Sequence, residues 1–323
     1  MDFRTEIKLG KASFGIDHSA RIFMAGSCFS ENICRKMADV KFEVCGNPYG
    51  VLFNPASIAS MLTDLTARRS YDRGELAEKG GLWFSWKHHG SFSGGVPAQV
   101  MAGINEAAAR GADALAASEY VILTFGTAWV YRLLATGETV ANCHKMPAGM
   151  FARERLSAGD IADMYDPLFA GILKDKKVVL TVSPVRHLKD GFEENSLSKA
   201  VLRLAVGELM SRYGNVCYFP AFEIMNDDLR DYRFYADDMV HPSARAIDYI
   251  WEKFSGWAFD PRSQELLPKL EKLSSAMNHR VLNPAAEENK VFAAKMASLA
   301  HELESLLPET DFSREKSYFS AML

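Results

Sequence analysis

The segment EYVILTF, residues 119–125, is almost continuously apolar, contains β-branched side chains and ends at Gly126. A strand with apolar residues at successive positions is buried on both faces, which is typical of a parallel sheet covered by helices. This segment therefore predicts a central strand of an α/β protein.

Similar apolar runs occur on both sides of this segment and alternate with helical stretches. Strands are predicted at RIFMA, KFEVC, KVVLTV and VCYF, residues 21–25, 41–45, 177–182 and 216–219. Helices are predicted over residues 31–39, 105–117, 157–173 and 195–213, and from Asn54-Pro55, where Asn caps a helix and Pro fits its first position. This alternation indicates a three-layer α/β/α sandwich with five parallel strands and helices on both faces.

Two stretches depart from the alternation inside this domain. Residues 82–87 (LWFSWK) alternate like a solvent-facing strand, and residues 129–141 have the pattern of a hairpin that turns at Thr136-Gly137. We expect both to be insertions at one edge of the sheet.

The sequence pattern changes after residue 260. Residues 263–277 and 285–307 have helical periodicity, many charges and no strand signal. We therefore divide the chain into an α/β domain, residues 1–260, and a helical C-terminal extension, residues 261–323. Such an extension can pack on the domain or mediate oligomerisation, and the sequence does not decide between these.

Composition narrows the classes of function. Of 323 residues, 48% are hydrophobic and 24% charged, and 37 Lys and Arg against 41 Asp and Glu give a net charge of −4. This excludes collagen-like, coiled-coil and mostly disordered chains, and argues against nucleic acid as the main partner. With no apolar run long enough for a membrane span, no secretory leader and five unpaired-looking cysteines, we expect a cytoplasmic protein.

A serine follows the first predicted strand, in Gly26-Ser27. In an open parallel sheet, ligands bind beyond the carboxyl ends of the strands, where loops lead into helices. A serine there can act as a nucleophile while its own N–H stabilises an oxyanion. The alternative is that Ser27 or Ser30 only caps the helix.

An aspartate and a histidine three residues apart follow the fifth predicted strand, in ADDMVHPS, residues 236–243. Asp238 can accept a hydrogen bond from one ring nitrogen of His241 and leave the other free to take a proton from serine. The next helix is expected to begin at Pro242. A purely local turn-stabilising pair is the alternative, but the serine and the pair together favour a hydrolase.

Taken together, these residues resemble the GSCFA family, a branch of the SGNH (GDSL-like) serine hydrolases. The resemblance covers residues 1–260 and implies a flavodoxin-like sandwich, Ser27 as nucleophile, His241 as general base and Asp238 as its partner. It does not fix the substrate. The segments that carry it are GSCF at 26–29, NP at 54–55, GTAW at 126–129, NCHK at 142–145, SPVRH at 183–187 and DMVHP at 238–242.

The oxyanion hole is where the sequence departs from the wider SGNH pattern. The glycine whose N–H lines that hole is matched by Gly50, with Gly46 as a fallback, and Ser27 would supply its own N–H. The asparagine that follows the third strand is absent, because Ala128 occupies its position. Loss of such a donor costs about 10²- to 10³-fold in rate, so activity is weak or another donor replaces it. Our hypothesis for the replacement is Asn142.

Other polar and aromatic residues are candidates for lesser roles. Cys28 at a helix start is an alternative thiol nucleophile, although a packing role is favoured. The spacing of His88, His89, Cys143 and His144 matches no zinc motif. Trp83, Trp86 and Trp129 could stack on a sugar or simply pack. The candidate substrate-binding residues are His89, Gly126, Thr127, His144, Arg186 and His187.

These observations predict a cofactor-independent esterase that cleaves O-acetyl or short acyl esters of a small molecule or carbohydrate. Two alternatives stay open. One is an acyltransferase that uses the same residues. The other is a binding or scaffold protein with a degenerate site, which the missing asparagine and the charged C-terminal helices suggest.

Overall fold

The structure is a computed structural model that describes residues 5–279 and 286–323 of the chain. It contains two compact units. The first, called the sheet unit here, comprises residues up to Lys8, Arg21–Cys34 and Val44–Glu252; the second, the helical unit, comprises Leu9–Ala20, Arg35–Glu43 and Lys253–Leu323. Each unit therefore draws on several separate stretches of sequence.

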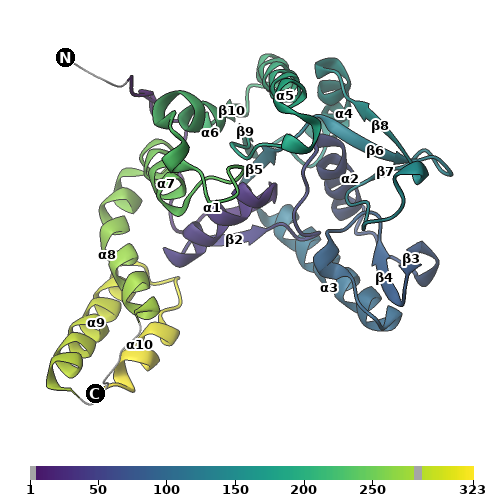
Figure 1. Cartoon of the computed structure of the whole chain (residues 1–323). Coiled ribbons are helices and arrows are strands. Elements are labelled where there is room, and N and C mark those ends of the chain that lie inside the picture. Colours follow the sequence, from purple (N-terminus) through teal and green to yellow (C-terminus); the bar gives the residue numbers. More distant parts are fainter. Residues whose placement is uncertain (1–4, 280–285) are drawn as a thin grey trace. The chain divides into compact units, whose positions relative to one another are not determined.

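A five-stranded sheet forms the centre of the α/β architecture (Figure 1). Its order is β10-β9-β5-β1-β2, and the β1–β5, β5–β9 and β9–β10 ladders are parallel. The predicted α/β class and all five predicted strands are confirmed, and β9 has the predicted bounds. The strands are β1 (Arg21–Gly26), β2 (Glu43–Gly46), β5 (Tyr120–Phe125), β9 (Lys177–Val182) and β10 (Val216–Tyr218).

The strand order determines where a ligand is expected. Numbered within this sheet, the order is 2-1-3-4-5, the flavodoxin-like arrangement, which reverses between its first and third strands. Here these strands are β1 and β5, so the crevice lies beyond Gly26 and Phe125, where the chain continues into Ser27 and into Gly126-Thr127.

Both faces of the sheet are covered, which explains the continuous apolar runs in the sequence. All six residues of β5 are buried, as are all but the first residue of β1 and β9. Phe23, Val121 and Leu180 share one hydrophobic core with four helices, whereas Ile22 and Ile122 are buried outside that core. The four helices are α2 (Pro55–Thr66), α3 (Pro97–Ala117), α4 (Ala158–Ala170) and α5 (Phe192–Arg212).

Local capping determines where several helices begin. The Asn54 side chain accepts the Ser57 N–H at 2.8 Å and Pro55 is the first residue of α2, as the sequence predicts. The helix expected from Asn105 begins earlier, at Pro97, another proline at a first helical position. Helix α1 (Cys28–Asp39) also begins earlier than residue 31.

The helix after His241 begins later than expected. Helix α7 (Ala244–Ala258) does not start at Pro242, because Pro242 forms an isolated antiparallel bridge with Tyr235 and the Ser243 N–H donates to the Phe234 carbonyl. A short helix, α6 (Ala221–Glu223), and a π-helical turn (Ile224–Leu229) precede this region.

The two expected insertions are present and each has a partner strand that the sequence analysis missed. Strand β4 (Leu82–Ser85) pairs with β3 (Leu76–Lys79), and β6 (Trp129–Leu133) pairs with both β7 (Thr139–Val140) and β8 (Phe151–Arg155). Because β8 has four exposed residues and β3 has no fully buried residue, neither carries an apolar pattern.

The helical unit contains α8 (Pro261–Asn278), α9 (Glu287–Leu306) and α10 (Ser313–Ser320). The first two match the predicted helices, although residue 285, where the second was expected to start, lies outside the described residues; α10 was not predicted. The Asp260 carboxylate caps α8 by accepting the N–H of Ser263 at 2.9 Å. None of the described helices combines the length and the apolarity needed to cross a bilayer.

Candidate active site

Ser27 lies at the turn that joins β1 to α1, directly after a glycine that the turn requires. Gly26 has φ +146°, and a Cβ there would stand 2.3 Å from the carbonyl oxygen of Thr124. Its N–H donates to Asn47 Oδ1 at 2.8 Å, and its carbonyl accepts the Leu52 N–H at 3.0 Å. The chain after β2 therefore holds Gly26, the residue directly before Ser27, in place.

The Ser27 hydroxyl is completely buried and donates to Ser183 Oγ at 2.9 Å. Ser183, the first residue after β9, is also completely buried, and its Oγ accepts the Val185 N–H at 3.2 Å. Within the described part of the chain, no hydrogen bond joins Ser27 to His241. The structure thus shows a Ser27–Ser183 pair at the crevice.

Asp238 and His241 form the pair that their spacing predicts. His241 Nδ1 lies 2.6 Å from Asp238 Oδ2, and Asp238 Oδ1 accepts the N–H groups of Val240 and His241, each at 2.9 Å. The His241 N–H and ring, with the Val240 N–H, lower the pKa of Asp238 to about 2. The carboxylate therefore stays ionised and fixes the orientation of the imidazole, which is half-exposed.

The loop after β9 links the Asp238–His241 turn to the loops beyond β1 and β5. The Arg186 N–H donates to the Val240 carbonyl at 3.1 Å, so this turn is attached three residues after Ser183. His187 Nε2 lies 3.3 Å from where a Cβ on Gly126 would stand. Burial first, and then the charges of Lys199 and His241, lower the pKa of His187 to about 3. His187 is therefore a neutral, packed side chain between these loops.

Two neighbouring residues of α5 hold the same loops, and sequence analysis missed them. Ser198 Oγ accepts the Ala128 N–H at 2.8 Å and lies 3.1 Å from Thr127 Oγ1. Lys199 Nζ donates to the carbonyls of Gly126 and Ser183, each at 2.7 Å. Lys199 is 2% exposed, and burial lowers its pKa to about 7.

A signal for Lys199 was present in the sequence. Lys199, Leu202, Val206 and Leu209 recur at helical spacing, and all four are buried. A lysine in such an apolar series must be neutral or must find buried acceptors. The carbonyls at the ends of β5 and β9 are those acceptors.

Of the predicted oxyanion donors, the Gly50 N–H has another partner in this structure, whereas the Asn142 NH₂ has none among the described residues. Gly50 has φ +75°, and its N–H donates to the Asn47 carbonyl at 2.7 Å, so an oxyanion role needs that bond to break. A Cβ at Gly50 would meet His89 Cβ at 2.4 Å, which places the His89 loop against this turn. Asn142 Oδ1 accepts the His144 N–H at 2.8 Å, and its Nδ2 lies 3.6 Å from where a Cβ on Gly90 would stand.

Other candidate residues are occupied in holding the structure. His144 Nε2 lies 2.9 Å from the Ser85 carbonyl, its ring stacks on Phe84, and burial lowers its pKa. His89 Nδ1 accepts the Ser91 N–H and caps a short 3₁₀ turn. Burial raises the pKa of Cys28 more than the nearby N–H groups lower it, which favours the packing role of Cys28 over the alternative of a thiol nucleophile.

The tryptophans and the possible metal ligands named in the sequence analysis form no common cluster among the described residues. Trp129 lies under the Arg153 guanidinium at 3.7 Å, Trp83 faces Arg73, and Trp86 packs on Phe84, so the three rings have separate partners. Across residues 5–279 and 286–323, His, Cys, Asp and Glu side chains form no group of three that could hold a metal ion.

The fold and this site define an α/β protein with a serine and an Asp–His pair on loops at the carboxyl edge of its sheet. The chain matches the model of the GSCFA family over residues 21–254 and that of the GSCFA domain protein, C-terminal domain, over residues 270–323. It therefore belongs to the GSCFA family. No curated protein matches it.

Proposed function

We propose that the protein hydrolyses O-acetyl or short acyl esters through an acyl-Ser27 intermediate. The observation that supports this most is the Asp238–His241 pair, whose 2.6 Å hydrogen bond leaves His241 Nε2 available as a base. Arg186 attaches this pair to the loop that begins at Ser183, and Ser183 in turn holds the Ser27 hydroxyl.

In the proposed reaction, the Ser27 hydroxyl turns from Ser183 to His241 Nε2. His241 takes the hydroxyl proton while Ser27 Oγ forms a bond to the ester carbonyl carbon. As the tetrahedral intermediate collapses, the bond to the alcohol oxygen breaks and His241 returns the proton to that oxygen. Water, activated by the same base, then cleaves the acyl-serine and releases the acid. Asp238, held ionised, stabilises the imidazolium in both halves.

The developing oxyanion needs N–H donors at the start of α1. Ser27 supplies its own N–H at the helix N-terminus, where the helix dipole also favours negative charge. We assign the second donor to Gly50, which must release the Asn47 carbonyl, and the third to Asn142, whose side-chain NH₂ donates to none of the described residues.

Labelling by a fluorophosphonate probe, together with hydrolysis of p-nitrophenyl acetate, tests this proposal. We expect the wild-type protein to be labelled and to hydrolyse the ester, and Ser27→Ala to do neither. Ser30→Ala is the matched control, because the buried Ser30 hydroxyl has no hydrogen-bond partner among the described residues. A wild-type protein that is neither labelled nor active would overturn the proposal.

Two observations favour the alternative of a binding protein with a degenerate site. The Ser27 hydroxyl faces Ser183, and the Gly50 N–H is used in a turn. The same probe separates the two, since a degenerate site is not labelled. Adding acceptor alcohols to the ester assay separates hydrolysis from acyl transfer, because an acyltransferase would form the new ester faster than free acid.

The substrate and the location of the protein belong to the same proposal. All five cysteines are free thiols, which supports a reducing compartment such as the cytoplasm. A small-molecule or carbohydrate ester is the substrate class we propose. We also propose the helices of the helical unit as the surface through which any oligomer would form.

A further inference from the structure

Two exposed aromatic rings lie around Arg186, and the carbonyl of a third exposed apolar residue, Met239, lies near its guanidinium, in the turn that carries His241. Phe192 is 63% exposed, Tyr232 is 61% exposed and Met239 is 44% exposed. Single exposed apolar residues are ordinary, but a cluster of them marks a binding surface. We call this set, Phe192, Tyr232 and Met239 around the Arg186 guanidinium, the Arg186 rim.

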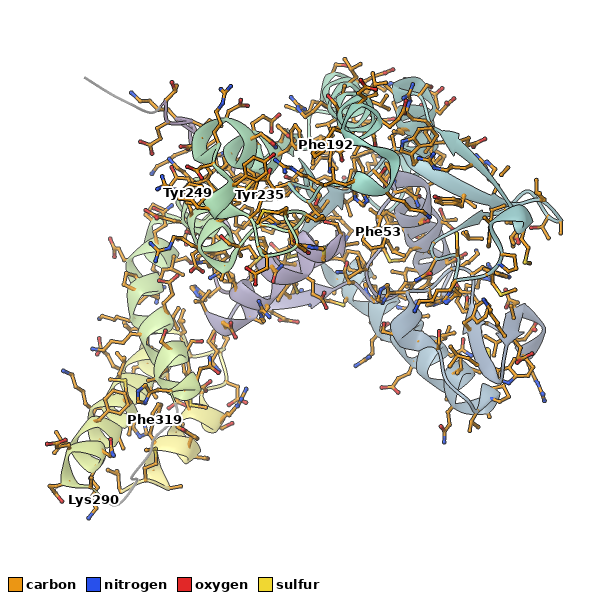
Figure 2. All side chains as sticks on the ribbon, viewed as in Figure 1. Phe53, Phe192, Tyr235, Tyr249, Lys290 and Phe319 are labelled. Atoms are coloured by element: carbon orange, nitrogen blue, oxygen red, sulfur yellow. The ribbon has the colours of Figure 1, made fainter. Side chains whose placement is uncertain are left out.

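The rim comes from three separate segments that meet at one cation. Arg186 Cζ lies 6.0 Å from the ring centre of Phe192, at the start of α5, and 5.3 Å from that of Tyr232. It stacks at 3.8 Å on Tyr235, which is buried beneath, and Arg186 Nη1 lies 3.4 Å from the Met239 carbonyl. Figure 2 marks Phe192, at the start of α5, and Tyr235, in the segment before α7. Cation–π contacts within 6 Å hold such an arrangement together.

The position of the rim relative to the base decides which part of a substrate it meets. Met239 stands between Asp238 and His241, and the Arg186 N–H bonds the Val240 carbonyl in the same turn. In the proposed reaction, His241 returns its proton to the departing alcohol, so the alcohol oxygen must lie against His241. The acyl group lies on the other side of the scissile bond, towards Ser27 and its N–H.

We propose that the Arg186 rim is the subsite for the alcohol part of the substrate and that it takes a flat ring stacked on Tyr232 and Phe192. This inference rests on the proposed esterase function and adds the class of alcohol. Exposed aromatic rings beside a guanidinium suit a ring with a weakly polar face and hydrogen-bond acceptors at its edge. A short linear alcohol would leave these side chains in water.

The test varies the alcohol and the acyl group separately. Phenyl acetate and 2-naphthyl acetate share an acyl group and differ in ring area, whereas p-nitrophenyl acetate and butyrate share an alcohol. We expect Tyr232→Ala and Phe192→Ala each to lower kcat/KM for 2-naphthyl acetate by roughly 2- to 10-fold and to lower kcat/KM for phenyl acetate by a smaller factor. The acetate-to-butyrate ratio should stay as in the wild type. Leu204→Ala, which removes an equally exposed apolar side chain elsewhere on α5, is the control.

Equal losses for both aryl acetates, or a changed acetate-to-butyrate ratio, would overturn the inference. A second readout separates it from the esterase proposal: saturation-transfer NMR of 2-naphthol, the product alcohol, with Ser27→Ala. If Tyr232→Ala in that background weakens the 2-naphthol signal, the subsite stands even if no ester is turned over. If the signal is unchanged, the subsite is wrong even if the esterase is real.

Discussion

Replacing Asp238 by Asn tests the pairing on which the proposed chemistry depends. Asn keeps an oxygen that can accept the N–H groups of Val240 and His241, now each 2.9 Å from Asp238 Oδ1. It places an NH₂ group where Oδ2 now lies 2.6 Å from His241 Nδ1. Because that NH₂ can only donate, the ring must present an unprotonated Nδ1 and carry its proton on Nε2, the nitrogen that must accept the Ser27 proton.

The expected loss follows from this geometry. A hydrogen bond to a charged group contributes about 1.5–3 kcal/mol, which corresponds to roughly 10- to 150-fold in rate. The wrong tautomer costs about 10⁴-fold where the histidine is rigidly held in serine proteases. His241 is half-exposed and can reorient, so we expect Asp238→Asn to lower kcat by roughly 10²- to 10³-fold.

The assay is p-nitrophenyl acetate hydrolysis from pH 5 to 9, with urea unfolding to show that the fold is intact. Asp237→Asn removes the same charge from the neighbouring exposed residue and should leave kcat within about twofold. If Asp238→Asn retains wild-type kcat while remaining folded, Asp238 does not orient the base and the reasoning is refuted.

Three further predictions concern the surroundings of Ser27. Gly26→Ala should lower the free energy of unfolding by more than about 2 kcal/mol in urea, since its Cβ would overlap the Thr124 carbonyl at φ +146°; Gly103→Ala, with nothing within 4 Å, should not. Lys199 is neutral in the folded protein above about pH 7, but in the unfolded chain only above pH 10.5. The free energy of unfolding of the wild type should therefore rise between pH 7 and 10, by up to about 1.4 kcal/mol per pH unit, relative to that of Lys199→Met. A difference between the two proteins that does not change with pH would contradict the assigned pKa. Asn142→Ala should reduce kcat on p-nitrophenyl acetate by roughly 10²-fold, and unchanged turnover removes Asn142 from the site.

The sheet could be predicted because its strands are buried on both faces. A continuous apolar run such as that of β5 must be buried on both faces to leave water, and the alternation of such strands with helices indicates a parallel sheet. Strands β3 and β8 could not be predicted, because exposed strands such as β8 (FARER) need no apolar residues. Their pairing comes from backbone hydrogen bonds, which any sequence can make.

Some contacts of the candidate site could likewise be predicted from the sequence, and others could not. Asp238 and His241 are three residues apart, so local geometry alone brings them together, and the sequence shows it. The Ser27–Ser183 bond joins residues 156 positions apart and depends on the register of β1, β5 and β9. The hydrogen bond from the Gly50 N–H to the Asn47 carbonyl depends on the conformation of one turn, which these residue types permit but do not require.

The Ser27 hydroxyl points to Ser183 rather than to His241, and the free-energy cost of turning it decides how far this lowers the rate of the proposed reaction. Turning the Ser27 hydroxyl from Ser183 to His241 exchanges one neutral hydrogen bond for another, and such a bond contributes about 0.5–1.5 kcal/mol net. Releasing the Gly50 N–H from Asn47 costs a similar amount, so the two rearrangements together reduce the rate by no more than roughly 10²-fold. Enzymes accelerate their reactions by about 10⁶-fold or more, and serine hydrolases deprived of a triad residue keep about 10³-fold over water. Under the proposed mechanism these costs are small beside that enhancement, so we expect a slow esterase rather than an inert protein.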